Sequence, residues 1–476
     1  MGINKQSARI KHHTSTTSGS FTVPASEDFT DGSWDKWDLA KSEIAVNEAD
    51  DTVSVRVGSN IRQIYPQGAS TGVFGISDSN GEYTFYTTIA LANTSASSGD
   101  TIVFFANVTE TGTTEFILKD GVNYNLNGYT YENSNAGTND AVTDNNVAVT
   151  CTIFNGTIKR TGGTASDTNS LALHLDSTTS DLTLNGVNVI NDFGVATRVD
   201  SIIRGGRHYG ETKGIIAPLN GSTLYDTYSY GETSYGVSVY GSLYNCVSES
   251  NTSYGGYLFT SVEAHNCSFY SASSQGANIR GARLYNCSFE SDGNYGAYFQ
   301  TATNYAENCS FYSSANIALH VIATTKCFNC SAVSTGSYAV WTSVELYGVT
   351  AYSTSNSAFY CSDNTVKLLN CSGESNAAAC VTSRGYHYNC SFICSWNNAS
   401  GHAIMDINTA SQYNDVFDCY LEVANSSAYC LGSATTAKNV YFGNNTYKGA
   451  TTAVNTTYIT QAQTNAPDAY GNILIG

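Results

Sequence analysis

Carboxylates on the outer face of a repetitive chain are the residues that could carry out chemistry here. Glycoside cleavage commonly uses two carboxyl groups about 5–10 Å apart, one acting as an acid and one as a base or nucleophile. Glu249, Glu290 and Glu374 hold the same position in three repeats, but never in neighbouring repeats. Glu290 and Asp292 could project from one face, and they are the predicted catalytic pair if the protein is an enzyme. A solvated surface pair is the alternative.

A second set of candidate residues is mostly aromatic. In successive repeats, the residue that directly follows a buried apolar residue of one short strand recurs at steps of 19, 21, 20, 20 and 21 residues. This spacing predicts that these residues form a single outward column. Such a column suits sugar rings, which stack on aromatic faces, and it equally suits a contact between subunits that would cover exposed aromatic side chains. Both interpretations stay open. The column consists of Tyr240, Phe259, Arg280, Gln300, His320 and Trp341.

Metal and cofactor signals are weak. Cys327 and Cys330 have the spacing found in zinc knuckles, yet no second CxxC or His pair accompanies them. There is no Gly-rich phosphate loop leading into a helix. We therefore predict no metal site and no cofactor.

The elements that must position these residues follow from an internal repeat. An Asn-Cys-Ser segment or a close variant recurs at steps of 21, 20, 22, 21, 19, 22 and 19 residues, with Val349 replacing one cysteine. Alternate positions around the cysteine are apolar or small, which predicts a strand with one buried face and places the residue two before each cysteine inside. A second short strand, often opened by Gly, precedes it. The repeated cysteines, called here the ladder cysteines, are Cys246, Cys267, Cys287, Cys309, Cys330, Cys371 and Cys390.

Short strands joined by Gly, Ser and Asn corners predict one coil of a solenoid. Each coil can bury its inner face only if others stack on both sides. Equivalent residues of successive coils then lie about 4.8 Å apart, so that Cys stacks on Cys and Asn on Asn. The predicted fold is all-β, a right-handed parallel β-helix in which cysteine is a small apolar interior residue. Disulfide bridges between stacked cysteines are the rival interpretation.

Repeat length divides the chain into four parts. Residues 1–95 contain a predicted β-hairpin, from 43–47 and 52–57, and form a small β-rich attachment domain. Residues 96–225 have long coils with steps of 28 and 30 residues, and residues 226–395 have regular coils of about twenty. Residues 396–476 form C-terminal coils or a cap.

Composition supports this interpretation and excludes several partners. The 476 residues include 42 Gly and 34 Tyr but only 4 Pro and 13% charged residues, a composition typical of an all-β protein. A net charge of −18 makes nucleic acid a poor partner. No apolar run is long enough to span a membrane, and the polar start Met1–Gln6 has no export signal, so the 14 cysteines are expected to be reduced thiols.

The arrangement of a short attachment unit and a long β-helix resembles bacteriophage fibre and tailspike proteins. The stretches Gly99–Phe105 and Phe116–Tyr124 resemble the opening coils of pectate-lyase-like phage β-helices. Gln6–Lys11 and Ile44–Asp50 are similar to segments in virion-attached fibre proteins of crAss-like gut phages. The resemblance implies a homotrimer that is fixed to other virion proteins through residues 1–95.

These observations together predict a structural virion protein. We expect a head or tail fibre that assembles in the host bacterial cytoplasm, stands on the virion surface and contacts host surface polysaccharide. The alternative is a tailspike depolymerase, a glycosidase or lyase that cleaves that polysaccharide. The structural prediction gives no catalytic residue, whereas the enzymatic one depends on Glu290 and Asp292.

Overall fold

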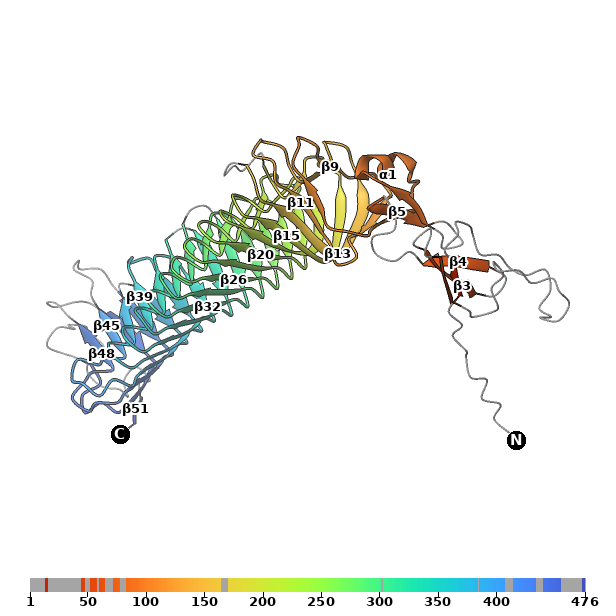
Figure 1. Ribbon diagram of the computed structural model, residues 1–476. Helices are drawn as coiled ribbons and strands as arrows, with labels where there is room; N and C mark the ends of the chain where they lie inside the picture. The colour runs from red at the N-terminus through yellow and green to blue at the C-terminus, as the bar shows by residue number, and fades with distance from the viewer. Residues whose placement is uncertain are drawn as a thin grey trace, which may run out of the picture.

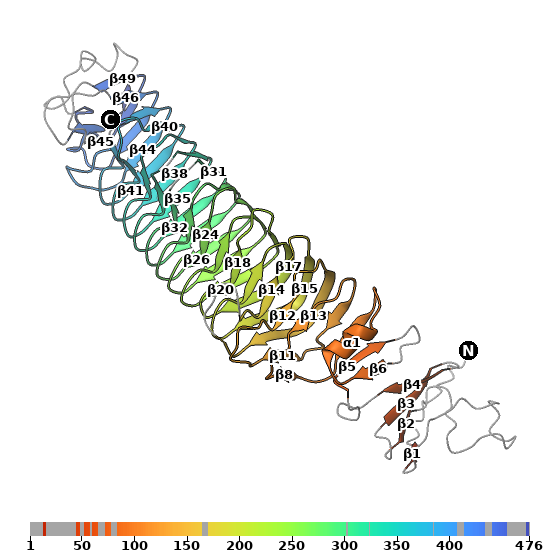
Figure 2. The ribbon, with the colours of Figure 1, turned by 90° about the horizontal axis from the view of Figure 1, so that it is seen from above.

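The computed structural model describes most of the chain from residue 72 onward. The described residues are 72–77, 83–163, 170–300, 303–322, 324–383, 385–406, 414–433 and 440–454, with the backbone of strands 13–15, 44–47, 52–57, 60–64 and 473–475. Figures 1 and 2 show the coils stacked along one axis, with the N-terminal sheet at one end and the last coils at the other.

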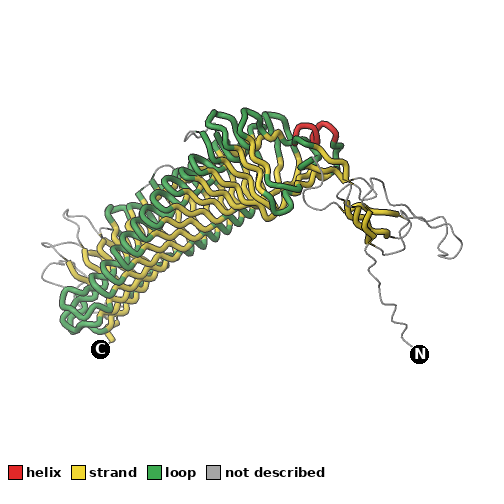
Figure 3. The backbone as a smooth tube through the Cα atoms, viewed as in Figure 1, coloured by secondary structure: helices red, strands yellow, loops and turns green. Residues whose placement is uncertain are grey.

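Each regular coil contains three short strands. In one coil these are β27 (Ala277–Ile279), β28 (Arg283–Tyr285) and β29 (Ser288–Ser291). β27 belongs to a 15-stranded sheet with one strand per coil, whereas β28 and β29 belong to a 32-stranded sheet. The strands of successive coils pair in parallel. The prediction of an all-β parallel β-helix is confirmed, and Figure 3 shows how strands dominate the backbone.

The 15-stranded sheet carries the site described below. Its strands are β9 (Phe116–Ile117), β12 (Val142–Thr143), β14 (Leu173–Leu175), β16 (Thr197–Val199), β18 (Ile215–Ala217), β21 (Val237–Val239), β24 (Gly256–Leu258), β27, β30 (Ala297–Phe299), β33 (Leu319–Val321), β36 (Val340–Thr342), β39 (Phe359–Cys361), β42 (Val381–Ser383), β45 (Ile404–Asp406) and β48 (Leu431–Ser433).

The repeated Asn forms a tight corner between the two strands of the 32-stranded sheet. Asn286 has φ +54°, and Gly348 has φ +62° where one repeat lacks Asn. Asn and Gly are the residues that adopt this left-handed conformation at least cost. The corner interrupts the alternation of the strand, so Leu284, three residues before Cys287, is buried and Tyr285 is not. The prediction that the residue two before each cysteine lies inside was wrong for this reason.

The interior is filled by stacked residues of the same type. Every ladder cysteine is buried and carries a free thiol. Phe289 stacks between Phe269 and Phe311, with ring centroids 5.1 and 5.2 Å apart. Buried apolar side chains run as one continuous core from Phe74 to Val454 through the described coils. Each coil is therefore stabilised mainly by its two neighbours.

The N-terminal end of the solenoid begins earlier than predicted. β5 (Phe74–Ser77) pairs antiparallel with both β6 (Tyr83–Tyr86) and β7 (Thr101–Phe104), and α1 (Ile89–Ser95) packs Ile89 and Ala92 into the same core. Residues 72–77 and 83–95, which lie before the predicted boundary at residue 95, thus cover the open end of the first coil. An open end would otherwise expose apolar side chains and unpaired strand edges.

The N-terminal strands form a separate four-stranded sheet. Its order is β1 (His13–Ser15), β2 (Ile44–Asn47), β3 (Thr52–Val57) and β4 (Asn60–Ile64). β2 and β3 pair antiparallel from Ile44–Val55 to Asn47–Thr52. The predicted hairpin is confirmed.

Candidate functional site

The outer face of the 15-stranded sheet presents one residue from the middle of each strand. From β14 to β42 the residues that flank this position on each strand are buried in the core, so the central residues lie above one another in a column. The strand pairings define this column as Ile117, Thr143, His174, Arg198, Ile216, Ser238, Tyr257, Asn278, Tyr298, His320, Trp341, Tyr360, Thr382 and Met405.

The structure divides the predicted column of Tyr240, Phe259, Arg280, Gln300, His320 and Trp341 into two columns. Tyr240, Phe259, Arg280 and Gln300 follow the last residue of their strands, and the equivalent residue in the next coil is Ile322, whose backbone N–H bonds to Phe299. His320 pairs instead with Tyr298 and Trp341 in the central column. The step from Phe299 to Val321 is 22 residues, two more than the step assumed from the sequence.

Eleven aromatic side chains on this face form what we call the aromatic belt. Within it, Tyr240 and Phe259 stack with ring centroids 3.9 Å apart, and Trp341 lies 4.6 Å from Tyr360. All of its members are partly exposed. The belt consists of Tyr235, Tyr240, Tyr254, Tyr257, Phe259, Tyr295, Tyr298, His320, Tyr338, Trp341 and Tyr360.

Two polar residues of the central column each have one side-chain atom that lacks a hydrogen-bond partner: Asn278, which lies between aromatic members of the belt, and His320, which belongs to it. Asn278 Oδ1 and His320 Nδ1 are both buried and unpartnered. Burial lowers the pKa of His320 to about 4, so the ring is neutral at neutral pH. Arg280 lies over the ring of Tyr257, 4.9 Å from its centroid, and its Nε donates to Gln300. The belt thus combines flat apolar faces with the partly exposed polar side chains of Arg280 and Gln300.

A second aromatic column follows the 32-stranded sheet, at the residue before each Asn corner. Tyr244 and His265 stack at 5.2 Å, and Phe328 and Tyr347 at 5.1 Å. In the coil that follows Tyr285, the equivalent residue is Glu307, so one member of this column is not aromatic. This second aromatic column comprises Tyr225, Tyr244, His265, Tyr285, Phe328, Tyr347, Tyr388 and Phe417.

The predicted catalytic acids have aromatic neighbours. Glu290 pairs in register with Tyr270 on one side and Tyr312 on the other. Asp292 accepts hydrogen bonds from the Tyr270 hydroxyl at 2.8 Å and from Ser314 Oγ at 3.1 Å. The structure therefore brings no carboxylate from a neighbouring coil into the strand position of Glu290.

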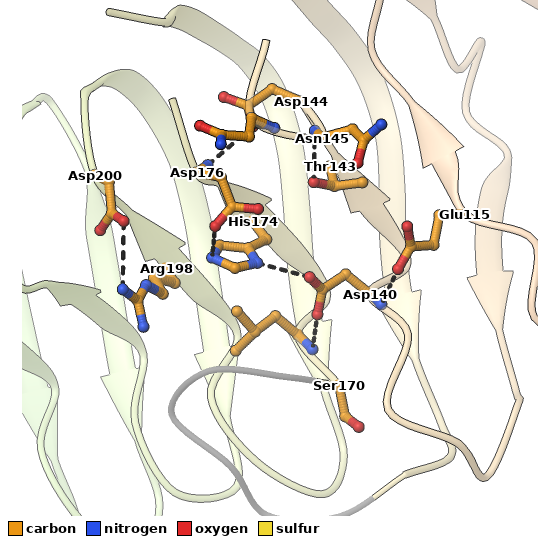
Figure 4. A network of polar contacts seen from close by, with 12 residues as sticks. Glu115, Asp140, Thr143, Asp144, Asn145, Ser170, His174, Asp176, Arg198 and Asp200 are labelled. Carbon is orange, nitrogen blue, oxygen red and sulfur yellow. Dashed lines mark hydrogen bonds and ion pairs between the residues drawn. The ribbon is translucent and has the colours of Figure 1, made fainter. Parts of the chain in front are cut away.

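A network of polar contacts lies at the N-terminal end of the central column (Figure 4). His174 is 6% exposed and stands between two carboxylates, with Nδ1 2.7 Å from Asp140 and Nε2 2.9 Å from Asp176. Burial opposes the charged ring, but the hydrogen bond and charge of Asp140 and the charge of Asp176 outweigh it and raise the pKa of His174. Asp144 is fully buried and accepts from the backbone N–H groups of Asp176 and Ser177.

Asp176 and Asp200 occupy equivalent positions in neighbouring coils, each directly after its strand. The backbone N–H of Asp200 bonds to Leu175, the residue before Asp176. Asp200 also accepts from Arg198 Nη2 at 3.3 Å, and its other oxygen has no partner. Burial and the neighbouring carboxylates raise the pKa of Asp176 against the opposing effect of His174.

Sequence reasoning missed this pair because the search for acids covered only the regular coils. A signal was nevertheless present. Residues 173–177 and 197–201 share a basic residue, an aliphatic residue, Asp and Ser in the same order. Twenty-four residues separate the two copies, which is one coil at this point of the chain.

Two further observations concern metals and membranes. Among the residues that the structure describes, no group of three or more His, Cys, Asp or Glu side chains could hold a metal ion. Cys327 and Cys330 are both buried in the core. No helix in the described ranges is long and apolar enough to cross a membrane.

Comparisons with known proteins returned little. No protein-family model matches the chain, and no curated protein matches it. Among solved structures, ORF18 of Geobacillus virus E2 aligns with 86% of this chain and 70% of its own, at 10% sequence identity and a TM-score of 0.16.

Proposed function

We propose that this protein is a virion fibre subunit that binds bacterial surface polysaccharide through the aromatic belt. The belt is the observation that carries the proposal. Monomeric soluble proteins rarely expose a contiguous apolar patch of this kind unless it binds a partner. Ring faces suit the apolar faces of pyranose rings, and the partly exposed Arg280 and Gln300 beside them carry polar groups that can hydrogen-bond to hydroxyl groups.

The geometry of the solenoid fits a linear ligand. Belt residues on successive coils repeat at the inter-strand spacing of about 4.8 Å along the axis of the solenoid. A polysaccharide chain that lies along this axis meets a ring or a polar side chain on every coil from β21 to β39. Such repeated weak contacts add up when one chain engages several of them at once.

The test is retention of the purified protein on an array of bacterial capsular and O-antigen polysaccharides. We expect retention of the wild-type protein and its loss in a Trp341→Ala, Tyr360→Ala double variant. The matched control is Tyr312→Ala, Tyr352→Ala, two partly exposed tyrosines of the 32-stranded sheet outside both aromatic columns, and it should leave retention unchanged. Equal retention of the belt variant and the wild type would contradict the proposal.

The proposal includes a homotrimer fixed to other virion proteins through residues 1–95. The second aromatic column supplies a separate surface on which subunits can pack, because it lies on a different sheet from the aromatic belt. Aromatic side chains are enriched in the cores of subunit interfaces. Light scattering should give three times the chain mass, and a monomer would remove this part of the proposal.

One observation favours a second function, hydrolysis of the bound glycan. Asp176 and Asp200 follow equivalent strands of neighbouring coils, about 4.8 Å apart along the stack, which is nearer to the carboxyl separation of retaining glycosidases than to that of inverting ones. Asp176, with its raised pKa, would protonate the leaving oxygen while the Asp200 carboxylate attacks the anomeric carbon, and water activated by Asp176 would then release the sugar from Asp200. New reducing ends on a retained polysaccharide, lost in Asp176→Asn but kept in Asp292→Asn, would support this function. Intact polysaccharide after incubation would exclude it.

A further inference from the structure

A groove of about 650 Å³ opens beside the aromatic belt, at the corner that joins the 15-stranded sheet to the 32-stranded sheet. It begins directly after the belt residue Phe259, since Thr260 and Ser261 form part of its wall. On its far side lie residues from one column of the second sheet. In register, these are Glu263, Arg283, Tyr305 and Lys326.

The walls of this corner groove are held in place by buried contacts. Asn304 is 1% exposed, and its Oδ1 accepts from the backbone N–H groups of Gly281 at 2.6 Å and Ala282 at 3.2 Å. Its Nδ2 donates to Thr325 Oγ1 at 3.2 Å. Gly281 has φ +99°, and Ser261 has φ +71°, so the turns that line the groove have a defined left-handed backbone.

The charges in the groove are unusual for this chain. The sequence has 39 acidic and 21 basic residues, so a basic side chain has many carboxylates available. Among the described residues, Arg204 pairs with Asp181, Lys367 with Glu345 and Lys448 with Glu422.

Arg283 and Lys326 are both exposed, and neither has an ion-pair partner in the described part of the chain. Each cation has an acid on the next coil of the column, Glu263 beside Arg283 and Glu345 beside Lys326. Glu263 contacts His265 at 3.1 Å, and Glu345 contacts Lys367 at 3.9 Å. The two cations therefore remain without a paired carboxylate, one on each side of Tyr305 in the column.

We infer that the corner groove binds an anionic substituent of a sugar, a carboxylate or a phosphate. Arg283 offers the planar, forked donors that match such oxygens, and Lys326 adds a second positive charge two coils away, roughly 9–10 Å along the stack. Tyr305 lies between them in the column, and its ring packs against Tyr285 and Phe328, which leaves the two cations as the recognition elements. The inference rests on the proposed function because it names the class of glycan that the belt and groove hold together, an acidic one.

The test uses short defined probes on the full chain. Tetragalacturonate supplies carboxylates, glucose 1-phosphate supplies a phosphate, and maltotetraose is the neutral match. We expect at least one anionic probe to bind about tenfold more tightly than maltotetraose, with affinity that falls as salt is raised from 0.05 to 0.5 M because exposed charges are screened. Calorimetric titration measures both. The anionic probe that binds identifies which substituent is recognised.

Variants make the result specific to the groove. Arg283→Gln, Lys326→Gln should lose the preference for the anionic probe, whereas Lys367→Gln should retain it. Lys367 is the matched control because it continues the same column through Glu345, with which it already pairs. Equal affinity for charged and neutral probes, or an unchanged preference in the double variant, overturns the inference.

The outcome separates this inference from the proposed function. If wild type and the groove variant are retained equally on neutral and acidic polysaccharides, the belt binds glycans but the groove does not select for charge, and the inference fails alone. If no polysaccharide is retained while the anionic probe still binds in an Arg283-dependent manner, the proposed function fails and the groove stands as an anion site.

Discussion

At the scale of the residue, the Asn corner decides which side chains of a coil lie inside. Asn286 has φ +54° and donates through Nδ2 to Asn266 Oδ1 at 3.2 Å. A residue with a branched Cβ is strained in this conformation, whereas Gly348 already holds the equivalent position in another coil. The side chain of Asn therefore contributes less than its backbone conformation does.

Replacing Asn286 tests this account of the corner. We expect Asn286→Val to lower the free energy of unfolding by about 1–2 kcal/mol, the cost of a left-handed conformation for such a residue. Asn286→Gly should cost less, because Gly adopts the same φ freely and loses only one exposed hydrogen bond. Urea unfolding followed by circular dichroism compares the two variants. An equal loss in both would show that the side-chain ladder, and not the backbone, stabilises the corner.

The cysteines test the description of the interior. Burial raises the pKa of Cys361 and of Cys430 to about 12, so neither thiol ionises at pH 8. Because all 14 cysteines are buried and the reagent has to reach the sulfur, we expect no reaction of the native protein with Ellman's reagent and full reaction after denaturation. Cys309→Val should retain the native resistance of the other thiols, since Val349 occupies the equivalent position in another coil. Rapid labelling of the native protein would contradict a closed core.

At the scale of the element, a buried serine closes the turn that follows most strands of the β29 type. Ser353 is fully buried, and its Oγ donates to the carbonyl of Ser337 in the preceding coil at 2.7 Å. The same Oγ accepts from the backbone N–H of Asn356 at 3.1 Å. One hydroxyl thus joins two successive turns of the solenoid.

Removing this hydroxyl takes a partner from two partly buried backbone groups. We expect Ser353→Ala to lower the free energy of unfolding by about 1–3 kcal/mol, because two hydrogen bonds of about 0.5–1.5 kcal/mol each are lost. Ser353→Cys should cost less, because Cys394 fills the equivalent place two coils on and its Sγ bonds to Ala378 at 3.1 Å. Thermal unfolding of both variants measures the difference. If Ser353→Ala unfolds like the wild type, the turns are held by backbone bonds alone.

The strands of the regular coils could be predicted from the sequence because each repeat states the pattern again. The sequence could not show which residue of each coil belongs to which outward column. A coil of 22 residues differs from one of 20 by two residues in a loop, and a column extrapolated by sequence spacing then moves from Ile322 to His320. Only the strand pairing shows which of the two residues stacks on Gln300.

At the scale of the whole molecule, buried neutral histidines make stability depend on pH. Burial lowers the pKa of His208 to about 4 and that of His387 to about 3. An unfolded histidine titrates near 6.5, so below that pH the unfolded chain binds more protons than the folded one. Stability from these groups is present above pH 6.5 and is lost as pH falls toward 4. His174, whose pKa is raised, acts in the opposite direction.

Thermal unfolding at pH 7 and pH 5 measures this dependence. We expect a lower midpoint at pH 5, and the difference should shrink in His387→Gln by an amount on the order of 1–2 kcal/mol in unfolding free energy. The window lies above the range in which most carboxylates titrate, which isolates the histidines. A midpoint that rises on acidification would show that the His174 network, not the buried neutral rings, dominates.

The candidate site was only partly predictable at this scale. The aromatic composition of the outer face is visible in the sequence, and Tyr240, Phe259 and Trp341 do lie in the aromatic belt. The corner groove and the polar network of His174 depend on contacts between coils 20 to 34 residues apart, which no local pattern specifies. The His174 network is harder still to predict, because it lies in the long coils, whose spacing departs from the regular repeat.

The central claim is that the aromatic belt binds glycan. Hydroxyl-radical footprinting of the full chain, with and without a polysaccharide that it retains, tests this claim residue by residue. We predict that Tyr298, Trp341 and Tyr360 are protected by the polysaccharide, while Tyr244 and Tyr347 on the other sheet are oxidised equally in both samples. Protection of Tyr244 and Tyr347 with no change at Trp341 and Tyr360 would contradict it.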